Sequence, residues 1–164
     1  MSDRDLTYFF TARLSDPNSD LLTREVSQLR DAMRATQQRY PFHINAIVIL
    51  PNAIHTLWTV PEKDTQIRQR WSMLKSHFSR RLPPAYFQTR AQVERSDKHI
   101  WHRSIWQHLI TDSADLATHR QVIHSAPVQA GLVDQAQDWS WTSLHRDIAN
   151  RTLAANPEPP VGFS

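Results

Sequence analysis

The sequence predicts an α+β fold of the ferredoxin-like, split β-α-β type, with a four-stranded antiparallel sheet, two helices on one face and an appended C-terminal helix. Three observations lead to this prediction. Segments with strand and helix patterns follow one another in the order β-α-β-β-α-β-α. Two apolar runs near the middle are separated only by a short turn, which indicates an antiparallel hairpin. Both early helices are amphipathic, so each has an apolar side with which to cover the sheet.

The first two elements are a strand and a helix. Residues 6–14 are rich in aromatic and β-branched side chains and stop at a turn cluster (SDPN), so they are expected to form a strand. Thr23 can cap the helix that follows. Apolar residues then recur at helical spacing through about residue 38, and Pro41 ends the pattern.

The hairpin and a second helix come next. Residues 43–50 and 54–60 form the two arms of the predicted hairpin, and because both are strongly apolar, both are expected to be buried central strands. The second helix has apolar residues at positions i, i+4, i+7 and i+11. Those residues are Ile67, Trp71, Leu74 and Phe78. The following prolines, Pro83 and Pro84, end this helix.

The last strand and a third helix complete the predicted fold. Residues 85–98 show no periodicity and are expected to form a loop, after which residues 100–110 are expected to form the last strand. Asp112, with Asp115 three residues later, can begin a third helix. Pro127 is expected to close that helix.

The composition narrows the class of protein. A chain of 164 residues suits one domain, expected at residues 1–150, and the proline-rich residues 151–164 are expected to be a tail. The absence of cysteine excludes disulfides and thiolate metal sites, and it favours the cytoplasm. No segment approaches the roughly 20 apolar residues of a membrane span. Since there are only two glycines, a glycine-rich phosphate loop is excluded, which argues against a nucleotide-hydrolysing enzyme.

Three stretches of the chain together resemble one protein family. They are residues 41–62 (PFHINAIVILPNAIHTLWTVPE), 100–133 (IWHRSIWQHLITDSADLATHRQVIHSAPVQAGLV) and 138–148 (DWSWTSLHRDI). In order and spacing they resemble the REP-associated tyrosine transposases of bacteria, a group of single-tyrosine HUH transposases. With the first strand and the intervening helices, the resemblance covers about residues 6–148.

The resemblance implies a single-stranded DNA nickase and strand-transferase. In that family a tyrosine on the third helix attacks a DNA phosphate and leaves a 5′-phosphotyrosine. Two histidines and a third polar ligand hold Mg²⁺ or Mn²⁺ on the scissile phosphate. A phenol is a poor nucleophile near neutral pH, so the metal is needed to stabilise the charge that develops on the phosphate.

The chain departs from the family pattern at each catalytic position. On a strand, positions 53 and 55 share a face, so a His-x-His pair there could hold one cation, but the pair is Ala53 and His55. The position of the nucleophilic tyrosine falls on Val122, and that of the third metal ligand falls on Ala126. A valine cannot form a phosphodiester link. We therefore expect no cleavage by the family mechanism, no bound metal cofactor, and a hydrogen-bonded structural role for His55.

Two other interpretations of the chain are possible. A divergent but active strand-transferase could use His119, His124 or Tyr86 as its nucleophile. A folded protein-interaction domain would have no affinity for nucleic acid. His102 and His108, six residues apart, share a face of the predicted last strand and are expected to be solvent-facing or structural histidines.

The leading hypothesis is a transposase-like protein that binds a structured single-stranded DNA hairpin without cutting it. A net charge of +3 with nine further histidines favours a nucleic-acid partner modestly. The expected phosphate contacts lie mainly on the second helix; they are Arg68, Arg70, Lys75, Arg80, Arg81 and Arg103, with Arg95 and Lys98 between. One or two tryptophans are expected to stack on bases, from the set Trp58, Trp101, Trp106, Trp139 and Trp141.

Overall fold

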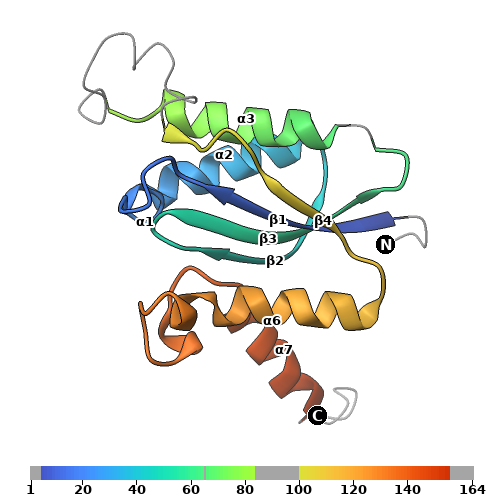
Figure 1. Cartoon of the computed structure of the whole chain (residues 1–164). Helices are drawn as coiled ribbons and strands as arrows, with labels where there is room; N and C mark the ends of the chain where they lie inside the picture. Colours follow the sequence, from blue (N-terminus) through green and yellow to red (C-terminus); the bar gives the residue numbers. More distant parts are fainter. Residues whose placement is uncertain (1–4, 65, 84–99, 156–164) are drawn as a thin grey trace, which may run out of the picture.

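Residues 5–64, 66–83 and 100–155 are described by a computed structural model of the chain. The elements lie in three layers, with two long helices above the sheet and one long helix below it (Figure 1). Tyr86, Arg95, Lys98 and the predicted loop at residues 85–98 lie outside the described residues. Among those that are described, none of the helices has the length and apolar character needed to cross a membrane.

The sheet has the predicted topology. Its strands are β1 (Asp5–Arg13), β2 (His43–Ile49), β3 (Ala53–Pro61) and β4 (Trp106–Leu109). They are antiparallel neighbours in the order β2-β3-β1-β4, which places β3 between the parallel strands β1 and β2. This is the split β-α-β arrangement, so the predicted ferredoxin-like fold is confirmed.

The upper face of the sheet carries the larger core. The short helix α1 (Leu21–Arg24) leads into α2 (Val26–Arg39), which packs beside α3 (Ile67–Arg80). Aromatic rings from strands and helices meet beneath these helices: Trp58 stacks on Trp71 with 4.4 Å between ring centroids, and Phe10 lies 5.0 Å from Trp58. All three are buried, so the apolar side of each predicted helix does cover the sheet.

The lower face carries α6 (Ser113–Gln129), followed by the short helix η2 (Ala136–Asp138) and by α7 (Leu144–Ala155). Asp112 caps α6 by accepting a hydrogen bond from the Asp115 backbone N–H at 2.7 Å, as predicted. A second, smaller core lies between this helix and the sheet. It includes Phe9, Leu57, Ile123 and Ala126.

Three predicted elements differ from the structure. Pro127 lies inside α6 and does not close it, because a proline near the C-terminal end costs one hydrogen bond and the last turn can still form. The last strand is Trp106–Leu109 rather than residues 100–110. The predicted strand is interrupted at residues 102–105, and before the gap Trp101 keeps only an isolated antiparallel bridge to Leu14. The Trp101 ring is buried against Phe78, 5.6 Å away, and its N–H donates to the Lys75 carbonyl. The helix α7 was not predicted, and it crosses the expected domain end at residue 150.

The strand β2 is an edge strand, although residues 43–50 were expected to be central. Its outer edge is covered by the segment before α7: the Ile49 N–H donates to the Trp141 carbonyl, and the Ser143 N–H donates to the Ile47 carbonyl, both at 2.8 Å. This cover explains the apolar character of β2, because an apolar edge without a partner would invite aggregation.

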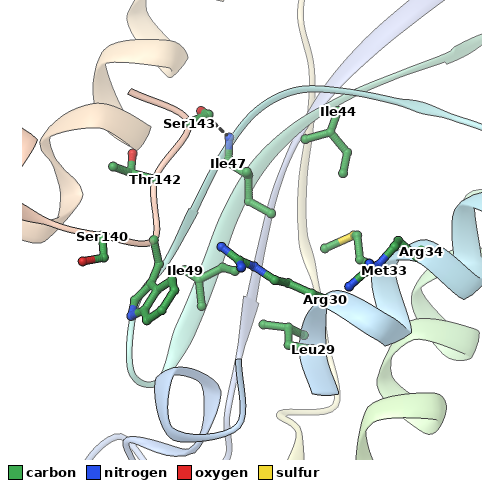
Figure 2. Close-up of a pocket in the computed structure, with 11 residues that line it drawn as sticks. Leu29, Arg30, Met33, Arg34, Ile44, Ile47, Ile49, Ser140, Thr142 and Ser143 are labelled. Carbon is green, nitrogen blue, oxygen red and sulfur yellow. Dashed lines mark hydrogen bonds between the residues drawn. The ribbon is translucent and has the colours of Figure 1, made fainter. Parts of the chain in front are cut away.

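A pocket of about 450 Å³ opens beside this covered edge. Figure 2 shows Arg30 and Arg34 of α2 on one side, Ile44, Ile47 and Ile49 of β2 as the floor, and Ser140, Thr142 and Ser143 on the other side. The Arg30 guanidinium lies 5.2 Å from the ring centre of Trp141. These contacts join α2 to the C-terminal segment across the strand edge.

Candidate functional site

The family positions meet on the lower face of the sheet. Ala53 begins β3, and His55 follows on the same face, turned toward α6. A second pocket of about 450 Å³ opens between the sheet and α6. Its lining residues are Phe9, Thr11, Arg13, His55, His102, Ser104, Trp106 and Val122. We call it the β3–α6 pocket; it brings together His55 and Val122, the residue that the family resemblance places at the nucleophile position.

The positions at which the family resemblance implies a nucleophile and metal ligands carry side chains that can do neither task, apart from His55. Val122 is 42 % exposed, so a side chain there reaches the pocket, but the valine offers no nucleophilic atom. Ala53 and Ala126 are buried and carry no ligand atom. One imidazole is too few ligands to hold Mg²⁺ or Mn²⁺, so the residues present do not fit the metal that the family resemblance implies.

His55 is a hydrogen-bonded strand histidine. Its Nδ1 lies 2.8 Å from the Thr11 hydroxyl, and its ring stacks on Phe9 with 6.0 Å between centroids. Burial, with a smaller contribution from the positive charge of Arg13, lowers the pKa of His55 to about 4. The imidazole is therefore neutral under physiological conditions.

The low pKa gives a testable pH dependence. In a proton NMR titration, the ring signals of His55 are expected to stay constant above about pH 5.5 and to shift with a midpoint of about 4. The unfolded chain binds the proton more readily, so the stability due to neutral His55 is complete above its ordinary pKa of 6.5 and is lost as the pH falls toward 4. Arg13→Ala should raise the midpoint, and a midpoint near 6.5 in the unmodified protein would contradict the assignment.

Of the alternative nucleophiles, Tyr86 lies outside the described residues, and His119 and His124 do not line the β3–α6 pocket. The His124 Nε2 lies 2.8 Å from the carboxylate of Asp147, in the first turn of α7, and burial lowers the pKa of His124. The His119 Nδ1 lies 3.0 Å from the Asp115 carboxylate. Since both histidines are engaged elsewhere, no observation among the described residues favours a replacement for the missing tyrosine.

The histidines that were expected to share one strand face have different surroundings. His102 precedes β4 and lines the β3–α6 pocket. Its Nδ1 lies 3.1 Å from the Ser104 hydroxyl oxygen. His108 is on β4, with its Nε2 2.9 Å from the Asp115 carboxylate. Its ring stacks on His119 with 4.6 Å between centroids. This group of His108, Asp115 and His119 was not predicted, because Asp115 was interpreted only as a residue of the helix start.

The predicted phosphate contacts are divided between two faces of the molecule. Arg68 and Arg80 on α3, and Arg81 directly after it, are exposed in the layer opposite α6 (Figure 1). Lys75 donates to the His102 carbonyl at 3.0 Å. Arg103 is exposed between two residues that line the β3–α6 pocket. Arg13, which was not among the predicted phosphate contacts, lines the pocket itself.

Arg70 is a correction to the predicted set. Its side chain is 2 % exposed and forms a bidentate pair with the Asp64 carboxylate at 2.6 and 2.8 Å. The same guanidinium donates to the backbone carbonyls of Tyr40 at 2.9 Å and Pro41 at 2.7 Å. Arg70 lies on the side of α3 that faces the protein interior, where the Asp64 carboxylate pairs with it. Arg70 therefore stabilises the fold and is not available to DNA.

Among the candidate tryptophans, exposure singles out one. Trp58 and Trp101 are buried, and Trp139 and Trp141 are partly buried. Trp106 is 65 % exposed at the rim of the β3–α6 pocket. Its cross-strand neighbour on β1 is Thr11, the hydroxyl partner of His55. An exposed ring beside a pocket with arginines is suited to stacking on an unpaired base.

Comparison with known proteins identifies the family. The chain is 39 % identical over 150 residues to the "Putative REP-associated tyrosine transposase" of Haemophilus influenzae, covering 88 % of this chain and 85 % of that protein. It is 35 % identical over 143 residues to the REP-associated tyrosine transposase of Escherichia coli K12, covering 87 % and 79 %. The chain belongs to the REP-associated tyrosine transposase family. No family model matches the chain.

Solved structures agree with this family assignment. The structure of a REP-associated tyrosine transposase bound to a REP hairpin is 32 % identical, with a TM-score of 0.74 over 97 % of this chain and 85 % of that chain. The crystal structure of "a putative transposase" from Deinococcus radiodurans is 15 % identical, with a TM-score of 0.50 over 72 % and 88 %. At that identity the second structure supports only the fold.

Proposed function

We propose that this member of the REP-associated tyrosine transposase family binds a REP-type single-stranded DNA hairpin and does not cleave it by tyrosine chemistry. The observation that carries the proposal is the β3–α6 pocket, where His55 and the basic rim remain while Val122 occupies the nucleophile position. Binding is supported by the relative whose structure contains a REP hairpin and matches 97 % of this chain. Without a nucleophile the chain cannot cleave DNA by tyrosine chemistry, but the surface that binds the hairpin does not depend on that side chain.

The proposed DNA surface is the rim of the β3–α6 pocket. Arg13, which lines the pocket, and Arg103, exposed between two lining residues, supply positive charge for phosphates. Trp106 supplies an exposed ring for an unpaired base. His55 stays neutral there and contributes no charge. The exposed arginines of α3 lie in the opposite layer, so we place them second: they reach DNA only where the nucleic acid extends around the sheet.

Hairpin binding tests the proposal. Fluorescence anisotropy with a labelled REP-type hairpin should show binding that weakens about tenfold or more between roughly 50 and 200 mM salt, because phosphate contacts release counterions. Affinity should be the same with EDTA as with Mn²⁺, since the positions at which the family resemblance implies metal ligands, 53, 55 and 126, carry one imidazole and two alanines. The hairpin should remain uncut. An affinity no greater than that for an unstructured strand would instead favour a protein-interaction domain, and cutting would favour the divergent enzyme.

Single substitutions locate the surface in the same assay. Trp106→Ala should lower hairpin affinity by about 5- to 150-fold, the usual range for loss of one base stack. Arg103→Ala should weaken binding more than Arg68→Ala, its matched control on the opposite layer. Equal losses at the two arginines would move the interface to α3.

A further inference from the structure

We propose that His108, Asp115 and His119 form a binding site for a divalent transition-metal ion, outside the family positions at 53, 55 and 126. One nitrogen or oxygen atom from each of the three residues lies within 4.8 Å of the others. Two imidazoles with one carboxylate form a donor set that suits Zn²⁺, Co²⁺ or Ni²⁺ rather than Mg²⁺ or Ca²⁺. The site is independent of DNA binding and is tested without it.

The spacing of the donor atoms indicates the type of coordination. The His108 Nε2 lies 2.9 Å from Asp115 Oδ2, and the His119 Nδ1 lies 3.0 Å from Asp115 Oδ1. Two ligand atoms about 2.1 Å from one ion are about 3.0 Å apart when they subtend a right angle at it. Because the two separations involve different carboxylate oxygens, they match an ion that both Asp115 oxygens contact, with each imidazole nearly perpendicular to its neighbouring oxygen and water in the remaining positions.

The three side chains are held in place by their surroundings. The Asp115 carboxylate accepts from the Thr111 N–H at 2.9 Å and from the Thr111 hydroxyl at 3.3 Å. His108 comes from β4 and His119 from α6, and their rings stack at 22° to each other. The His119 ring also lies 4.9 Å from Phe9. An ion would meet ligands that are already positioned, which reduces the ordering cost of binding.

The cluster has an open side. The His108 side chain is 36 % exposed, while those of His119 and Asp115 are 21 % and 17 % exposed. Without an ion, hydrogen atoms on the two ring nitrogens bridge to the carboxylate, and the His119 Nδ1 also lies 2.9 Å from the Asp115 carbonyl. Binding replaces these hydrogens, so an ion competes with protons for the two ring nitrogens.

Metal titration tests this proposal with glutamine substitutions. Glutamine keeps an N–H donor for Asp115 but removes the imidazole ligand. In the unmodified protein, free Zn²⁺ at about a hundred times its Kd should raise Tm by about 5–10 °C, and Mg²⁺ should not. His108→Gln and His119→Gln should each weaken Zn²⁺ binding in calorimetry by at least about tenfold. His124→Gln is the matched control, because His124 makes the same type of carboxylate contact, to Asp147, with no third ligand among the described residues.

Two results of the Zn²⁺ and Co²⁺ titrations would overturn the site: no response of the unmodified protein, or equal affinity in His108→Gln and the unmodified chain. If the glutamine variants fail to fold, NMR of the unmodified protein with Cu²⁺ still tests the site. Substoichiometric Cu²⁺ should broaden the NMR ring signals of His108 and His119 before those of His124. Broadening first at His55 and His102 would place the ion in the β3–α6 pocket and would refute the assignment.

Discussion

DNA cleavage and a covalent protein–DNA adduct are expected when the family residues are restored together by Ala53→His, Val122→Tyr and Ala126→Asn. The tyrosine would enter the β3–α6 pocket from an exposed helix position, beside a histidine pair that can hold Mn²⁺ on the phosphate. The adduct should survive a denaturing gel and require the metal. The unmodified chain should give neither cut DNA nor adduct.

A phenylalanine variant provides the control for this experiment. The protein with Ala53→His, Val122→Phe and Ala126→Asn has the same bulk and the same metal ligands without the hydroxyl. Adduct in the phenylalanine protein would mean that His119, His124 or another side chain is the nucleophile. Because Ala53 and Ala126 are 6 % and 9 % exposed, the new side chains need local repacking, so hairpin binding must first be shown to be unchanged. A restored protein that binds but does not cut would refute the positional assignment.

Arg70→Met is expected to lower the free energy of unfolding by about 3–5 kcal/mol, the largest single-residue effect we predict. The substitution leaves the Asp64 carboxylate, 8 % exposed, without its cation. It also removes the donor to the carbonyls of Tyr40 and Pro41, which join the end of α2 to β2. Denaturant unfolding followed by circular dichroism measures the change. Arg68→Met, two residues earlier on the exposed side of α3, should change stability by less than about 0.5 kcal/mol.

The same variant has a pH signature. Hydrogen bonds from Arg70 hold the pKa of Asp64 below its ordinary value of 3.8. The stability from this pair is therefore complete above pH 3.8 and is lost as the pH falls through the lower, folded-state pKa. The stability difference between the unmodified protein and Arg70→Met should narrow in strong acid. If the difference in the free energy of unfolding does not change with pH, or is as small as that for Arg68→Met, the Arg70–Asp64 pair contributes little to stability.

Local patterns were sufficient for most of the fold. The first strand, the hairpin and both early helices appear where alternation and helical spacing predicted them, because those periods reflect which side faces a core. The last strand was overestimated, since its pattern did not show that Trp101 turns into the core beneath α3. The edge position of β2 was also missed: its cover, residues 141–143, lies about a hundred residues away in the chain.

The sequence by itself determined the residue types at the site: a valine, two alanines and a single histidine at the positions where the family resemblance implies a nucleophile and metal ligands. Bond-forming capacity belongs to a side chain wherever it lies, so these absences could be interpreted without coordinates. Only the tertiary structure decided which charges face the pocket, that Arg70 is buried, and that His108, Asp115 and His119 meet. Those properties depend on distance and burial between separate elements, which a one-dimensional pattern does not contain.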